Sequence, residues 1–133
     1  MNAYDVTVGG SRISTAGASA KEAFDLWASI LSESMMKCSM EPLAGEPFHG
    51  VLEPCVRSEP ISIARVANSD ILARRTQRHI AASDEPYVLA CLTTAGVCDV
   101  RCGGTYLCSP VGTMYLVDPV TATSIACSVP RLV

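Results

Sequence analysis

The residues of this chain that could do chemistry are seven cysteines, two histidines and a small group of arginines. No two cysteines stand in a Cys-x-x-Cys pair, the spacing that structural zinc sites and thioredoxin-like redox pairs use. Cys98 and Cys102 would share one face of a strand and could form a redox-sensing pair, but nothing in the sequence lowers a thiol pKa. We therefore expect free, mostly buried thiols in a reducing cytoplasm.

Neither histidine stands in a catalytic or metal-binding pattern. His49 and His79 lie beside no nucleophile with a recognisable motif around it, which gives no support to a Ser-His-Asp or Cys-His arrangement. A zinc, iron or manganese site needs three or four ligands on converging faces, and a single imidazole does not provide them. The sequence therefore predicts no enzyme, no metal and no cofactor.

The arginines form one small basic cluster, Arg74, Arg75 and Arg78, in a chain of net charge −3. That overall sign is unsuited to neutralising nucleic-acid phosphates, so we expect no direct DNA contact by this chain. Arg75 and His79 are four residues apart and would share one face of a strand, where Arg75 could hold a carboxylate through two parallel hydrogen bonds. A solvated strand face is the alternative for Arg75.

One domain must position these groups. The 133 residues are 49% apolar and 17% charged, a composition typical of a compact core with a thin polar shell. Residues 1–18 are expected to form an arm, with a short strand at 4–8. No apolar run has the length of a membrane span and no charged, apolar leader precedes the first cysteine, so we expect a soluble, cytoplasmic chain without a membrane partner.

A helix is predicted over residues 19–37. Ser19-Ala20-Lys21-Glu22 is a capping box, and the charge of Lys37 suits a helix C-terminus. Between them an apolar stripe recurs at spacings of three and four residues, and it includes Phe24, Trp27 and Leu31. We expect this stripe to face a core or a partner. For Trp27 the alternative to such packing is a place in the lining of an effector pocket.

After Cys38 the chain has the short alternating segments of an all-β domain. The strands predicted from alternation and turn residues span 61–66, 87–94, 97–101, 105–108, 114–117 and 124–129. The nearly continuous apolar run at 87–94 is expected at the centre of the core, covered on both sides. Gly103-Gly104 is a two-residue hairpin signal, and 71–82 is ambiguous between helix and strand.

The segment from Gly104 to Pro119 resembles the second motif of the cupin fold, in which Gly is followed by five residues, Pro-x-Gly, two residues, His, three residues and Asn. Here Gly104 precedes Pro110-Val111-Gly112, while Tyr115 stands in the place of the metal-binding His and Pro119 in that of Asn. Gly104 tolerates a positive φ in the hairpin, and Pro110 fixes φ in the turn that Gly112 completes. The resemblance implies a cupin scaffold that is kept without its metal chemistry.

Six further stretches resemble the N-terminal, AraC-binding-like domain of AraC-type bacterial transcription regulators: 24–27, 47–50, 74–80, 92–96, 110–118 and 129–131. This resemblance favours a strand over 71–82. It implies a mainly β fold, a cupin-like double-stranded β-helix or jelly-roll barrel at 38–133, preceded by the α-helix at 19–37.

The resemblance also implies an effector-sensing and dimerising function. The barrel would bind a small-molecule effector, and the residues expected to line it are Arg75, His79, Tyr87, Cys91, Tyr106 and Tyr115. The helix stripe Phe24, Trp27 and Leu31 would join two copies in a homodimer. Transcription would be controlled through a C-terminal helix-turn-helix domain that is absent from this chain, which stops at Val133. A metal-dependent cupin enzyme and a dimerising module without a ligand are the alternatives.

Overall fold

The computed structural model describes residues 7–8, 12–43, 45, 47–58, 61–83 and 88–128. The chain forms two compact units, Met1–Trp27 with Glu46–Asn68 and Ala28–Gly45 with Ser69–Val133, and the boundary between them falls within the first helix. Both units are built on antiparallel strands, which confirms the mainly β fold with an N-terminal helix. Neither described helix has the length and apolar character that crossing a membrane requires.

The first helix, α1, spans Ala23–Ser34 and is shorter at both ends than the predicted 19–37. A turn precedes it, in which the Ser19 carbonyl accepts the N–H groups of Glu22 and Ala23, each at 3.0 Å. The helix ends at Ser34, although the Met35 N–H still donates to the Leu31 carbonyl at 2.9 Å. Lys37 therefore lies beyond the helix, and its Nζ donates to the Ala82 carbonyl at 3.1 Å.

The first unit contains a sheet in which β4 (Gly50–Ser58) pairs with three strands. Its antiparallel partners are β1 (Thr7–Val8), β2 (Ile13–Ser14) and β5 (Ile61–Asn68). The sequence predicted β5 but not β4, whose Gly50 and Pro54 suggested turns. The register shifts between Pro54 and Val56, and such a bulge tolerates a proline, which lacks the N–H of a regular ladder.

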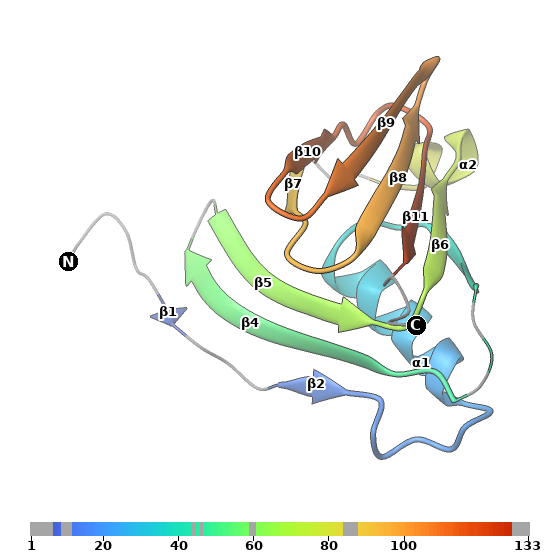
Figure 1. The fold of residues 1–133 in the computed structure, drawn as a ribbon, viewed down its shortest axis with the longest axis vertical. Helices are drawn as coiled ribbons and strands as arrows, with labels where there is room; N and C mark the ends of the chain where they lie inside the picture. Colours follow the sequence, from blue (N-terminus) through green and yellow to red (C-terminus); the bar gives the residue numbers. More distant parts are fainter. Residues whose placement is uncertain are drawn as a thin grey trace. The chain divides into compact units, whose positions relative to one another are not determined.

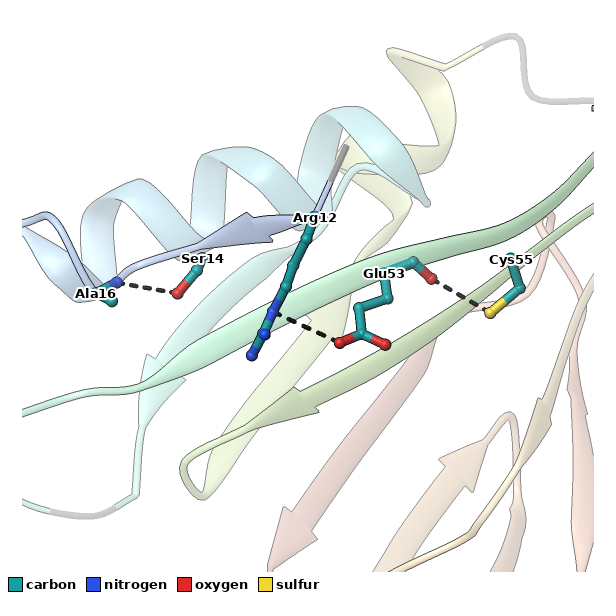
Figure 2. A network of polar contacts seen from close by, with 5 residues as sticks. All are labelled: Arg12, Ser14, Ala16, Glu53 and Cys55. Atoms are coloured by element: carbon teal, nitrogen blue, oxygen red, sulfur yellow. Dashed lines mark hydrogen bonds and ion pairs between the residues drawn. The ribbon is translucent and has the colours of Figure 1, made fainter. Parts of the chain in front are cut away.

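A polar network joins the start of β2 to β4 (Figure 2). Arg12 Nε lies 3.5 Å from Glu53 Oε1, and more than a third of each side chain is exposed. The Ala16 N–H donates to Ser14 Oγ at 3.1 Å, and Cys55 Sγ donates to the Glu53 carbonyl at 3.5 Å. Exposed ion pairs of this kind contribute about 0 to 1 kcal/mol, so this network fixes local geometry more than stability.

Trp27 is the centre of the apolar packing in the first unit and is fully buried. Its indole ring lies against the backbone of Gly50, so closely that a Cβ added at Gly50 would overlap the ring. Phe24 contacts Phe48 edge to face, with ring centroids 5.3 Å apart. The Gly50 N–H donates to the hydroxyl of Thr15 at 3.0 Å. The helix stripe predicted from the sequence therefore faces the interior of the chain here.

The second unit contains a five-stranded antiparallel sheet and a two-stranded one. The larger sheet has the order β3 (Ser39–Pro42), β6 (Ile71–Arg75), β11 (Thr123–Ser128), β8 (Val97–Cys102) and β9 (Thr105–Pro110), several of whose strands lie side by side in Figure 1. The smaller sheet pairs β7 (Leu89–Leu92) with β10 (Met114–Val117). Their core contains the buried side chains of Met36, Val100, Tyr115 and Val117, with Leu89, Cys91, Cys98 and Ile125 packed against them.

Turn geometry in this unit follows the sequence closely. The β8–β9 hairpin turns at Gly103-Gly104, with Cys102 opposite Thr105, as predicted. The positive φ (+61°) belongs to Gly103 and not to Gly104, which corrects the residue that the motif suggested. Gly112 has φ +89° and completes the turn after Pro110, as expected.

The prediction that 87–94 is covered on both sides is wrong. Leu92 is 57% exposed on β7, and its partner Met114 on β10 is 62% exposed. Only the alternate side chains of this ladder face the core, because successive side chains of a strand point to opposite faces. The other predicted strands of this unit are present, although residue 129 lies outside the described part of the chain. Of the strand predicted at 4–8 in the first unit, only residues 7–8 are described.

Gly50→Ala is predicted to destabilise the fold by about 1 to 3 kcal/mol, because the added methyl group must displace the rigid, fully buried ring of Trp27. Urea unfolding followed by tryptophan fluorescence measures the change. The control is Gly17→Ala, where an added Cβ meets nothing within 4 Å. Equal midpoints for the two variants would contradict the close contact.

Candidate functional site

Arg75 is the last residue of β6 and is buried, with 6% of its surface exposed. Its Nε and Nη2 donate to the Pro119 carbonyl at 3.1 and 2.9 Å, and its Nη1 donates to the Lys37 carbonyl at 2.8 Å. The solvated face considered for Arg75 is therefore wrong. One guanidinium joins three segments that are far apart in sequence.

The predicted strand over 71–82 is wrong in its second half, where α2 (Gln77–Ala81) follows β6. The Thr76 N–H donates to His79 Nδ1 at 3.0 Å, and the Thr76 hydroxyl lies 2.9 Å from the same nitrogen. This local pairing occupies the first turn, where backbone N–H groups lack helical partners. His79 therefore lies on a helix and does not share a strand face with Arg75.

An open groove of about 400 Å³ lies where β6 and β8 end and β11 begins. Three arginines and several residues with hydroxyl or amide side chains line it. The full lining is Arg74, Arg75, Thr76, Gln77, Arg101, Gly103, Ala122, Thr123 and Ser124. Ser124 pairs directly with Arg74 on one side and with Arg101 on the other. Directly opposed residues share one face of a sheet, so two arginines flank a serine there.

Tyr106 belongs to the same sheet face as Arg101, which it opposes in the β8–β9 ladder. The Arg101 guanidinium lies 5.4 Å from the centroid of the Tyr106 ring. The Tyr106 hydroxyl donates to Asp99 Oδ1 at 2.8 Å, and this bond raises the pKa of Tyr106. Tyr106 is 58% exposed, so it lies on the outside of the sheet and not in its interior, where the sequence placed it.

Cys91 and Tyr115, both predicted to line the barrel, lie side by side. They oppose one another in the β7–β10 ladder, on the side that faces the core. Burial raises the pKa of the Tyr115 hydroxyl, and the neighbouring thiols of Cys91, Cys127 and Cys98 raise it further. Burial also raises the pKa of Cys91. The phenol is therefore a neutral hydrogen-bonding group within a cluster of sulfur atoms.

The sequence did not single out a row of three hydroxyl groups beside this cluster, of which Thr93 and Ser109 are buried and Thr113 is exposed. Ser109 Oγ lies 2.9 Å from Thr93 Oγ1 and 2.6 Å from Thr113 Oγ1, and the Thr113 hydroxyl donates to the Pro110 carbonyl. A hydroxyl has one proton, so Ser109 donates to Thr113 and Thr93 donates to Ser109. The Thr93-Thr94 pair after β7 and the Ser109-Pro110 pair at the end of β9 are the sequence features that could have indicated these linked hydroxyl groups.

The residues in the cupin motif positions do not fit a metal ion. Tyr115 and Pro119 stand where the motif has His and Asn, and a proline has no side-chain ligand. Across the described residues, no group of three His, Cys, Asp or Glu side chains is arranged to hold a metal.

Two predictions about site residues remain, Tyr87 for ligand binding and the helix stripe for dimerisation. Tyr87 lies outside the described residues. Trp27 and Leu31 are buried, and Phe24 packs on Phe48, so a direct contact with a second copy would require the helix to move. Dimerisation through this stripe stays a prediction.

Comparison with known proteins identifies the class. A family model described as the AraC-binding-like domain matches residues 27–130. The chain therefore belongs to the AraC-binding-like domain family, a cupin-like regulatory domain of AraC-type regulators. No curated protein and no solved structure matches the chain.

Arg75→Gln is predicted to lower the free energy of unfolding by about 2 to 4 kcal/mol, because it removes the charge-assisted bonds that a buried guanidinium donates to the carbonyls of Lys37 and Pro119. The neighbouring Arg74→Gln is the control, since its exposed ion pair with Glu41 at 3.6 Å contributes about 1 kcal/mol at most. Urea unfolding measures both variants, and similar losses would contradict the structural role of Arg75.

Proposed function

We propose that this chain is the effector-sensing part of an AraC-type transcription regulator and that the effector is a small organic carboxylate. The groove at the end of the five-stranded sheet carries the proposal. Arg74 and Arg101 present two exposed cations on one face, with the Ser124 hydroxyl between them. A guanidinium binds a carboxylate through two parallel hydrogen bonds, so this spacing suits an anion with an apolar body.

The surroundings of the groove support an anionic ligand. Arg101 lies over the Tyr106 ring, which holds the guanidinium in place. The carboxylate beside Arg74 is that of Glu41, in an exposed ion pair that a ligand can displace at small cost. Thr76 and Gln77 at the start of α2 add polar groups to the same wall.

The regulatory step is a population shift. A ligand that contacts β6, β11 and β8 favours the conformation of the domain in which these strands are closest together. It shifts the equilibrium between this conformation and the alternative one only by the difference in its affinity for the two. In the regulator, this shift would change the presentation of a DNA-binding domain. A metal-dependent enzyme is the less supported reading, because the motif positions lack ligands.

Aromatic carboxylates are predicted to raise the thermal midpoint of unfolding, whereas the corresponding neutral amides are not. A ligand at a hundred times its dissociation constant adds about 2.7 kcal/mol, which is a shift of several degrees in a domain of this size. Differential scanning fluorimetry over a matched panel of acids and amides measures it. The shift should decrease with added salt, because the groove is open to solvent.

Arg74→Gln and Arg101→Gln should each reduce the carboxylate shift. Arg12→Gln is the matched control, because Arg12 is an exposed arginine in a similar ion pair at 3.5 Å and does not line the groove. Equal shifts for acids and amides, or no shift with any ligand, would contradict the proposal. The second result would favour a dimerising module without a ligand.

A homodimer is a separate part of the proposal. Apolar side chains suited to a contact are exposed on the outer face of β7 and β10, where Leu92, Met114 and Leu116 are each more than half exposed. Light scattering is expected to give twice the chain mass. A monomer at all concentrations would contradict dimer formation by this chain alone.

A further inference from the structure

Three sulfur atoms and a phenol meet in the interior of the second unit. Cys98 on β8 directly opposes Cys127 on β11, and their Sγ atoms are 2.6 Å apart. Cys91 on β7 and the Tyr115 hydroxyl on β10 interact with the same pair. None of the seven cysteines forms a disulfide in this structure.

The position of Cys98 and Cys127 suits a covalent bond better than an ordinary thiol contact. Their separation exceeds an S–S bond length by only about 0.6 Å. Directly opposed residues of an antiparallel ladder also have Cβ atoms about 4.5 to 5.5 Å apart, so a small adjustment reaches disulfide geometry. Both side chains are partly exposed, so a small oxidant can reach them.

The two thiols differ chemically although they touch. The hydrogen bond from Cys127 lowers the pKa of Cys98 to about 6, against the opposing effect of burial. The same bond, together with burial, raises the pKa of Cys127. The pair therefore titrates as a unit, and Cys98 is its more acidic partner. A thiolate beside a protonated thiol is the arrangement that a two-step oxidation needs.

We propose that Cys98 and Cys127 are a modification site at which a hydroperoxide forms a cross-strand disulfide. The Cys98 thiolate attacks one peroxide oxygen, an S–O bond forms, the O–O bond breaks, and the leaving oxygen takes a proton from solvent to give an alcohol or water. Cys127 then attacks the sulfenic sulfur, the S–S bond forms, and hydroxide leaves as water with the Cys127 proton. The two sulfur atoms together lose two electrons, which reduce one peroxide.

This inference is independent of the carboxylate site. The oxidisable pair lies on the core side of β8 and β11, whereas Arg74 and Arg101 lie on the outer face of the same sheet. The disulfide would fix the register of β8 against β11.

The test treats the reduced full chain with hydrogen peroxide, alkylates the remaining thiols and maps the products by mass spectrometry. We expect loss of two of the seven thiols and a Cys98–Cys127 link. Cys127→Ala should stop at a Cys98 sulfenic acid that dimedone traps, whereas Cys98→Ala should form neither product. Cys108→Ala is the control, because Cys108 is exposed on the adjacent strand β9 and should leave the link unchanged.

The pH profile of alkylation gives a readout that does not depend on disulfide formation. The rate at Cys98 should level off above about pH 6, whereas that of an ordinary thiol rises to about pH 8.5. In Cys127→Ala the Cys98 midpoint should move upward, and circular dichroism verifies that each variant is folded. A link between other cysteines, no loss of thiols, or a Cys98 profile like that of an ordinary thiol would overturn the inference.

Discussion

The antiparallel pairing of β11 with both β6 and β8 is the interaction on which the second unit depends. It joins residues 71–75, 97–102 and 123–128 into neighbouring strands. The ladder hydrogen bonds are local, but their register decides which side chains meet, because a slip of one residue would move every side chain to the opposite face. Arg75 ties the end of β6 to the segments just before β3 and β11, since its guanidinium binds the carbonyls of Lys37 and Pro119.

The two faces of this sheet carry different chemistry because of that single register. On the outer face the pairing aligns Arg74, Ser124 and Arg101, which form the wall of the groove. On the core side it places Cys127 directly opposite Cys98, beside Tyr115. Ligand binding at the outer face and oxidation at the core side would therefore both act on the position of β11. One strand is thus the element through which either event could reach the rest of a regulator.

Local patterns predicted much of the fold. The Gly103-Gly104 turn, the alternation of β5 and the Pro110-x-Gly112 spacing are short-range features, and the structure contains each of them. The prediction was less accurate where a side chain overrides the pattern. Thr76 and His79 start a helix inside a segment expected to be a strand, and the bulge beside Pro54 allows a strand where turn residues accumulate.

The sequence predicted the strands that carry the candidate residues better than the pairing between them. Cys91 and Tyr115 lie in strands that the apolar runs indicated, and these two strands pair. The Cys98–Cys127 pair could not be found from spacing, since 29 residues separate the two and only the β8–β11 register brings them together. The sequence suggested Cys98 with Cys102 instead, which lie on the same strand. The burial of Arg75 also depends on distant carbonyls that no local pattern shows.

The groove between Arg74 and Arg101 is the proposed binding site of a small carboxylate. Amide NMR spectra of the isotope-labelled chain, recorded while an aromatic carboxylate is added, test it most directly. We predict that the signals of Thr76, Gly103 and Ser124 shift together and saturate with one dissociation constant, and that the matching amide leaves them unchanged. Saturating shifts confined to β4 and β5, or no shifts at any concentration, would contradict the account.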